Sequence, residues 1–421
     1  MRSAGLFLAL LLLVGCSGEP ASTTGPATTA GSDTTVTTTT VTAEPAGSTA
    51  ASGGGGGLLV LDGSGNVAVL APDGSGSTPI TNDAGGEQVY LQPTWAPDGD
   101  RVVVTSLTPE GSAVLVAPLD GEATPTTTEF APFYYQWSPT GDMVAFLGTP
   151  QQGGIALGML DVAAGTAETI DTGQPYYLHW SSDGSRLAVH VGADRLDLVD
   201  PVTGDLTPLG QPPGSFQAPE WHPDGSRLVA VLRAAGGGVN ASYSRLLAQP
   251  ADQRLAVLDV DSGEVDELAT GAVASHLAPG RDLIAYYVAG PQGGEVWVTD
   301  LTGGNPERVA RGTVVALQWS PDGDRLLMLR LAPENAAPVV PLVWDDGETT
   351  DFPGFTPTRA FLNEYLPFWE QYSRGMTLWS PAGDAFAYPA ASPDGDQILV
   401  QPVDATEPVV AGEGRVVAWS P

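Results

Sequence analysis

The stretch LQWSPDGDRLLML spans residues 317–329 and joins two apolar segments through a tight turn. Pro321 fixes its own φ angle, Asp322 can accept hydrogen bonds from the backbone just ahead of it, and Gly323 can adopt the left-handed conformation. The apolar residues on both sides favour two antiparallel strands. Alone, this stretch predicts a β-hairpin whose first strand ends at Trp319.

The same pattern recurs along most of the chain. Leu277 takes the Trp position once, and the other anchors are Trp95, Trp137, Trp180, Trp221, Trp319, Trp379 and Trp419. Successive anchors lie 42, 43, 41, 56, 42, 60 and 40 residues apart, which indicates one period with two insertions. Such a period is typical of the four-stranded blades of a propeller. The eight anchors predict an all-β, eight-bladed β-propeller, with seven blades as the alternative.

The last residues predict how this ring closes. Residues 415–419 resemble the inner strand of a blade, and residues 58–61 resemble the strand that follows it. We therefore expect residues 415–419 to pair with strands from residues 58–81 and to complete the first blade. Such closure removes exposed edge strands.

The Trp-Ser-Pro-Asp-Gly repeats resemble the WD-like propeller repeats of the TolB family and of the propeller domain in dipeptidyl-peptidase-type serine peptidases. The resemblance covers residues 58–421. It implies a propeller fold, and TolB itself is a protein-interaction scaffold of the cell envelope. One fold hosts many activities, so the resemblance says more about structure than about function.

The first 57 residues are expected to lie outside the propeller. Residues 1–15 have the basic start and short apolar core of a signal peptide. Leu13-Val14-Gly15-Cys16 resembles the bacterial lipoprotein box, which implies that Cys16 carries the lipid. Residues 16–57 are rich in Thr and Gly and are predicted to be a disordered tether. We therefore expect a lipid-anchored protein on the extracytoplasmic face of a bacterial cell membrane, with no other contact with the bilayer.

Composition and motifs limit the possible activities. The net charge is −33 and all 16 basic residues are Arg, so the surface should repel nucleic acid. The sequence contains no Gly-x-Ser-x-Gly, no His-Glu-x-x-His and no Cys-x-x-Cys. Asp62-Gly63-Ser64-Gly65-Asn66 departs from a calcium loop at its sixth and twelfth positions and is interpreted as a turn. We accordingly expect no conventional enzyme, no cofactor and no metal. A propeller lyase or cyclase with active residues in the channel stays open, although no motif indicates one.

Polar residues stand directly before most anchors, on strands that are otherwise apolar. Because side chains alternate along a strand, these residues should face the central channel. Two interpretations remain open: a water-filled polar wall, or a site for a small molecule, carbohydrate or metal. The candidate ligand-binding residues are Gln136, His179, Glu220, His276 and Gln318, with Tyr134 and Tyr177 as stacking surfaces.

Two insertions interrupt the period. Residues 234–253 are rich in Gly and are expected to form a loop, whereas residues 353–375 are rich in aromatic side chains. Thr358 can cap a helical turn that Pro367 limits. The second insertion could cap the channel or fill a gap between blades; alternatively it could present a docking surface. The candidate docking residues are Tyr365, Phe368, Trp369, Tyr372 and Arg374.

Two functions follow from these features. The first is a non-enzymatic scaffold that binds an unidentified envelope or secreted protein, and the second is a binder of a small molecule, carbohydrate or metal in the channel. The chain is expected to be a monomer.

Overall fold

The computed structural model describes residues 56–214, 217–233, 253–291, 293–332 and 338–421. Two units are distinguished, residues 1–53 and 54–421, and the described residues all belong to the second. The predicted signal peptide, Cys16 and nearly all of the tether lie outside the described residues. The predicted loop over 234–253 also lies outside them, apart from Gln253.

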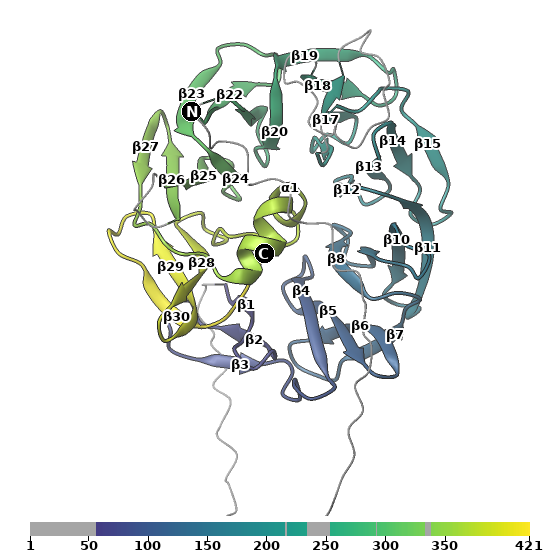
Figure 1. Ribbon diagram of the computed structural model, residues 1–421. Coiled ribbons are helices and arrows are strands. Elements are labelled where there is room, and N and C mark those ends of the chain that lie inside the picture. Colours follow the sequence, from purple (N-terminus) through teal and green to yellow (C-terminus); the bar gives the residue numbers. More distant parts are fainter. Residues whose placement is uncertain (1–55, 215–216, 234–252, 292, 333–337) are drawn as a thin grey trace, which may run out of the picture. The chain divides into compact units, whose positions relative to one another are not determined.

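Eight antiparallel sheets form a ring around a central channel, which confirms the eight-bladed propeller (Figure 1). Blade 1 contains β1 (Leu58–Leu61), β2 (Val67–Leu70), β3 (Ser77–Pro79) and β31 (Val417–Trp419). Blade 2 contains β4 (Val89–Trp95), β5 (Arg101–Thr108), β6 (Gly111–Pro118) and β7 (Thr124–Thr127). Blade 3 contains β8 (Pro132–Trp137), β9 (Met143–Gly148), β10 (Ile155–Asp161) and β11 (Thr166–Gly173). Blade 4 contains β12 (Tyr176–Trp180), β13 (Leu187–Val191), β14 (Arg195–Val199) and β15 (Leu206–Pro208).

The second half of the ring repeats this order. Blade 5 contains β16 (Glu220–Trp221), β17 (Arg227–Arg233), β18 (Gln253–Asp259) and β19 (Val265–Thr270). Blade 6 contains β20 (Ala272–Leu277), β21 (Leu283–Val288), β22 (Gly294–Asp300) and β23 (Glu307–Gly312). Blade 7 contains β24 (Val314–Trp319), β25 (Arg325–Leu331), β26 (Val339–Asp345) and β27 (Glu348–Asp351). Blade 8 contains β28 (Ala385–Ser392), β29 (Gly395–Pro402) and β30 (Val409–Glu413).

The ring closes through β31, as the sequence predicts. β31 pairs with β1 in the register Leu58↔Trp419, Leu59↔Ala418 and Val60↔Val417. The backbone N–H of Arg415 also donates to the carbonyl of Leu61, at 2.9 Å. The first blade is therefore built from segments more than 330 residues apart in the sequence.

Each Trp anchor is buried between neighbouring blades. Four indole N–H groups donate to the carbonyl of the residue before the anchor in the preceding blade. These bonds are Trp95 to Ala418 (3.2 Å), Trp180 to Gln136 (3.1 Å), Trp319 to His276 (2.8 Å) and Trp379 to Gln318 (2.9 Å). Buried Trp side chains usually find such an acceptor. At these four positions the Trp both fills the apolar interface and bonds to the neighbouring blade, whereas the indole N–H groups of Trp137, Trp221 and Trp419 have no acceptor among the described residues.

The turn after the anchor explains why the repeat requires glycine. Gly323 has φ of +71°, a conformation that side chains rarely adopt. A Cβ atom there would also lie 2.6 Å from the carbonyl oxygen of Pro279 in the preceding blade. Two residues later, an arginine reaches across to the next blade. Arg101, Arg186 and Arg325 donate to the carbonyls of Gly141, Gly225 and Gly383, at 2.9, 2.7 and 2.9 Å.

The second insertion enters the channel. It forms a π-helical turn over Phe361–Tyr365, a 3-10 turn over Leu366–Phe368 and the short helix α1 (Trp369–Tyr372). Figure 1 shows α1 in the middle of the ring. We call residues 358–374 the plug.

Candidate site at the plugged channel

The plug is held by the inner strands of several blades. The Gln371 carbonyl accepts from the Tyr134 hydroxyl of blade 3 (2.9 Å), and the Gln371 side-chain oxygen accepts from the Leu178 N–H of blade 4 (3.1 Å). The Gln318 amide of blade 7 donates to the Ser373 carbonyl at 3.1 Å. The sequence placed the channel residues and this insertion in separate candidate sites, whereas the structure makes them contact one another.

The start of the plug follows the sequence prediction. The Phe361 N–H donates to the Thr358 hydroxyl at 3.2 Å, so Thr358 caps the first turn. The same hydroxyl donates to the carbonyl of Arg415 at 2.7 Å, which ties the turn to the segment before β31. Pro367 then lies in the 3-10 turn that separates the π-helical turn from α1.

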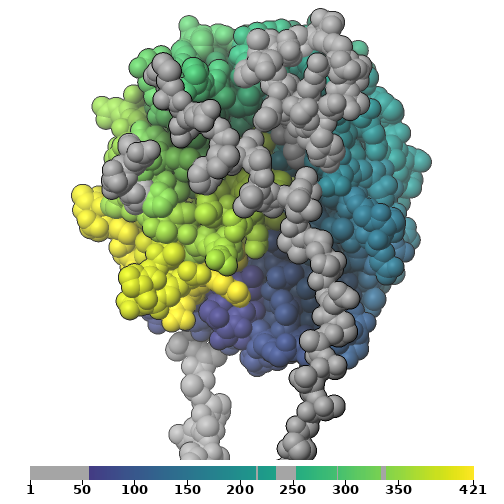
Figure 2. Space-filling model, in the orientation of Figure 1, coloured from purple at the N-terminus to yellow at the C-terminus, as the bar shows by residue number. Residues whose placement is uncertain are grey.

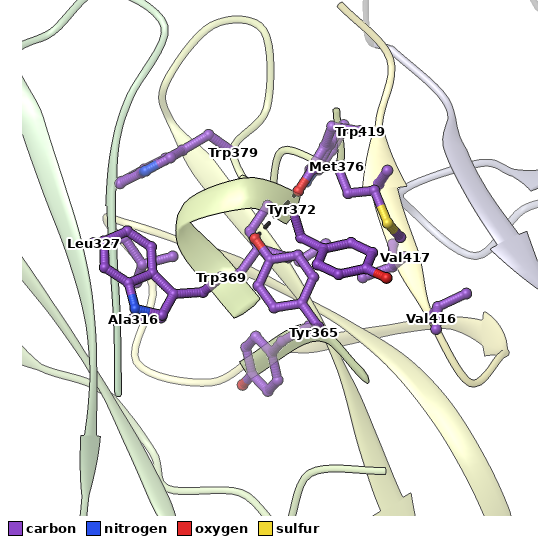
Figure 3. Packing of buried hydrophobic residues seen from close by; sticks show 14 of the residues in the cluster. Ala316, Leu327, Tyr365, Trp369, Tyr372, Met376, Trp379, Val416, Val417 and Trp419 are labelled. Carbon is purple, nitrogen blue, oxygen red and sulfur yellow. Dashed lines mark hydrogen bonds between the residues drawn. The ribbon is translucent and has the colours of Figure 1, made fainter. Parts of the chain in front are cut away.

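The aromatic side chains of the plug are mostly buried, which corrects the expected exposed patch. Tyr365, Trp369 and Tyr372 are less than one tenth exposed, whereas Phe368 is 40% exposed. Figure 3 shows Trp369 near Ala316 and Leu327, and Met376 on the side of Val416 and Val417. The ring of Trp369 also stacks on His276, with centroids 6.0 Å apart. The patch does not form because these rings pack into the apolar core of the protein itself.

Arg374 is the cation at the centre of the polar contacts. Its guanidinium pairs with the carboxylate of Glu220, whose side chain is only 1% exposed. Glu220 also accepts from the Leu277 N–H at 2.6 Å and from the Ser275 hydroxyl at 3.3 Å. A buried carboxylate needs such donors, because an unpaired buried charge is costly. Arg374, predicted to dock a partner, is thus engaged inside the molecule.

Hydrogen bonds link the strands that carry the three predicted residues. His179 contacts the backbone of Trp221, next to Glu220, and Glu220 contacts the backbone of Leu277, next to His276. Burial and then the charge of Arg374 hold the pKa of both imidazoles well below the ordinary value of 6.5. His179 accepts from the Trp221 N–H at 2.8 Å through Nδ1, and this requires the neutral form with the proton on Nε2. The lowered pKa values favour the neutral form of both imidazoles.

Glu370 is a second buried carboxyl in this cluster, and the sequence analysis missed it. Burial, and next the nearby charge of Glu220, raise the pKa of Glu370 well above 4.5. The site therefore combines the ion pair of Glu220 with Arg374, a carboxyl with a raised pKa and two imidazoles with lowered pKa values. No pattern in the sequence separates Glu370 from a solvated loop carboxylate, because only the seating of the plug buries it.

The remaining candidate residues are also enclosed. Tyr134, Gln136, Tyr177 and Gln318 are each at most 5% exposed. The structure therefore places all of them against other protein groups instead of along an open channel. Their role as ligand-binding residues stays a prediction.

Metal-binding clusters and membrane-spanning helices are both absent from the described part of the chain. There, no group of three or more His, Cys, Asp or Glu side chains is arranged to hold a metal ion. Across the same residues, no helix is long and apolar enough to cross a membrane. In the Asp62 loop, the carboxylate accepts from the N–H groups of Ser64 and Asn66 at 2.8 and 2.9 Å, as expected of a turn.

Comparison with known proteins supports the fold. No family model matches the sequence. An uncharacterized protein of Agrobacterium fabrum, Atu1656, is 26% identical over 271 residues, covering 58% of this chain and 86% of that protein. Similar solved structures include TolB from Acinetobacter baumannii, at 17% identity and a TM-score of 0.37. The match covers 61% of this chain and 65% of that TolB, less than two thirds of its length. The chain is an eight-bladed β-propeller, and TolB is among the structures to which it is similar.

The expectation that the chain is not an enzyme is wrong, because the lack of catalytic motifs does not exclude catalysis. The dihydro-heme d1 dehydrogenase NirN is similar in structure at 14% identity, with a TM-score of 0.56 over 86% of this chain and 74% of NirN. An enzyme can thus be built on this kind of propeller, although so distant a likeness shows the fold alone. The missing motifs belong to other folds, and for that reason they do not exclude catalysis here.

Proposed function

We propose that the chain is a lipid-anchored protein on the extracytoplasmic face of a bacterial membrane, where its propeller binds a partner protein at the plugged face. The lipoprotein-like box at Cys16 supports the anchor. The likeness to TolB-like propellers supports a scaffold role and nothing finer.

The observation that carries the proposal is the exposure of apolar side chains on the outward side of the plug. Leu362 and Phe368 are 49% and 40% exposed, although the aromatic side chains beside them are buried. The intervening positions Asn363, Glu364 and Pro367 are also exposed. Figure 2 shows yellow-green atoms, the colour of this part of the sequence, at the surface near the middle of the face. Two apolar side chains held rigidly by a buried base are suitable anchors for a partner.

Charge indicates the chemistry of that partner. The chain has 49 acidic residues and 16 arginines. Many of the arginines are already paired with carboxylates, among them Arg195, Arg227, Arg325 and Arg374. The surface is therefore dominated by unpaired carboxylates. A basic segment with apolar side chains would complement both the charge and the exposed Leu362 and Phe368.

The test is capture of partners from the envelope of the source bacterium, comparing wild type with Leu362→Ser/Phe368→Ser. The control is Val202→Ser/Val410→Ser, which removes two apolar side chains that are 82% and 50% exposed on outer strands and turns. All three proteins should have the same melting temperature, because surface substitutions change stability little. Capture is repeated at high salt.

We expect a protein that wild type and the control retain and the plug variant loses, with binding that weakens as salt is added. Equal capture by all three proteins would contradict docking at the plug. Capture that is unaffected by salt would contradict a basic partner.

The anchor is tested separately. A palmitate analogue supplied to growing cells should label wild type, and Cys16→Ser should lose both the label and the membrane fraction. Labelling that persists in Cys16→Ser would overturn the anchor without affecting the docking proposal.

The alternative, a ligand of the channel, has weaker support. The residues assigned to it are enclosed by the plug, and most of their polar groups already bond to it or to one another.

A further inference from the structure

A buried polar pocket surrounds the Arg374 guanidinium at the inner strands of blades 4 to 6. Glu220 on β16 pairs with it, and the charge of Arg374 acts on the nearby His179 of β12 and His276 of β20. A buried carboxylate that other donors hold in place suits a guanidinium, which is planar, always charged and weakly hydrated.

Glu220 and His179 are oriented by residues outside the plug. Glu220 is oriented by the Leu277 N–H and the Ser275 hydroxyl, and Ser275 in turn accepts from the Gln217 amide at 2.5 Å. His179 is oriented by the Trp221 N–H. These groups all lie on or beside the inner strands of blades 4, 5 and 6. The carboxylate is thus held in place before any cation arrives, which is the property of a preorganised binding site.

The seated plug leaves some polar atoms at this pocket without a hydrogen-bond partner among the described residues. Nε of Arg374 has no acceptor among the described residues, and neither Oε1 of Glu370 nor Nε2 of Gln371 has a partner there. Buried polar networks are most stabilising when every member is bonded. Three polar atoms of the plug are thus without a partner among the described residues.

We propose that this pocket is a binding site for guanidinium groups, and that Arg374 occupies it in cis. Its external ligand is a molecule with a guanidinium, such as an arginine side chain of a peptide, and that ligand competes with Arg374. In wild type the site is filled, so external guanidinium binds weakly. This inference does not depend on docking at the outer face of the plug.

The test is chemical rescue of Arg374→Ala with methylguanidinium as the probe. We expect Arg374→Ala to have a lower melting temperature than wild type, and methylguanidinium to restore part of that loss in a saturable way. By titration calorimetry the variant should bind methylguanidinium at least ~10-fold more tightly than wild type, because the pair it replaces is charge-assisted. Methylammonium should have no comparable effect, because it lacks the planar fork of donors.

The control is Glu220→Gln/Arg374→Ala, which removes the carboxylate that recognises the probe and should not respond. Failure of methylguanidinium to raise the melting temperature of Arg374→Ala would overturn the proposal, as would an equal response of the double variant or of wild type. If Arg374→Ala does not fold, the same comparison is made by refolding it from urea. Ligand-dependent recovery of folded protein then supports the site, and equal recovery with and without the probe overturns it.

Discussion

At the residue scale, the ionisable side chains in and beside the plug determine how stability should depend on pH. Glu370 has a raised pKa because it is buried and lies near Glu220. His276 is buried and His179 partly buried, and this loss of solvent together with the charge of Arg374 lowers the pKa of both. The neutral carboxyl is favoured by acid, and the neutral imidazoles are favoured by base. These opposite effects can be separated by removing one group at a time.

Glu370→Gln should become progressively more stable than wild type as pH rises above about 4.5. An acid whose pKa is raised on folding contributes stability below its unfolded value and loses that contribution as pH rises toward the folded value. Gln keeps the shape but cannot ionise, so it avoids this loss. The difference in unfolding free energy should grow by up to ~1.4 kcal/mol per pH unit. Urea unfolding of both proteins between pH 4 and pH 9 measures it.

The histidines give the matched comparison. A base with a lowered pKa loses stability as pH falls below its unfolded value of about 6.5. Wild type and Glu370→Gln share this loss, so it cancels in their difference. A difference that stays constant with pH would show that Glu370 is not buried as a neutral group.

At the element scale, the strands were predictable and the plug was not. Trp319 and the turn after it recur at a fixed spacing, and local chemistry determines such hairpins. The strand β31 was predictable because its residues match the start of that repeat. The plug has no repeat to align with, and its burial depends on a channel that exists only once all blades are assembled. The sequence therefore indicated its aromatic content and the cap at Thr358 but not which side chains face inward.

Removal of residues 415–421 should lower stability far more than the length of the segment suggests. The deletion takes away β31, including Trp419, and leaves β1 as an exposed edge. Loss of a buried Trp alone costs about 3–5 kcal/mol. Thermal unfolding by circular dichroism should show a large fall in melting temperature and loss of a single cooperative transition.

A pair of single substitutions controls for the truncation. Val417 lies in β31 and is 2% exposed, whereas Val410 lies in β30 and is 50% exposed. Val417→Asp buries a carboxylate and should cost several kcal/mol, while Val410→Asp should be nearly neutral. Equal effects of these two substitutions would argue against closure by β31.

At the scale of the whole molecule, the net charge of −33 opposes compaction. The ion pairs between neighbouring repeats, such as Arg227 with Asp282, are exposed and contribute little. Repulsion among the remaining carboxylates should therefore outweigh them. Added salt screens both the ion pairs and the repulsion among carboxylates. Because the repulsion is the larger effect, salt should stabilise the protein.

The melting temperature should rise as NaCl is increased from about 0.01 M to 0.5 M, since the Debye length shrinks from about 30 Å to below 10 Å over this range. Sodium chloride and potassium chloride should act alike, because the effect is screening. A melting temperature that falls with salt would mean that ion pairs between blades dominate.

The most direct test of the account is solvent access to the plug. Cys16 is the only cysteine, so in a Cys16→Ser background a single introduced thiol reports its own position. Asn363→Cys lies on the outward side, and Ser373→Cys is nearly isosteric at a side chain that is 8% exposed and contacts His276. A thiol reagent should modify Asn363→Cys about 100-fold faster than Ser373→Cys, because the latter reacts only when the plug opens. Equal rates in folded protein would mean that the plug does not occupy the channel.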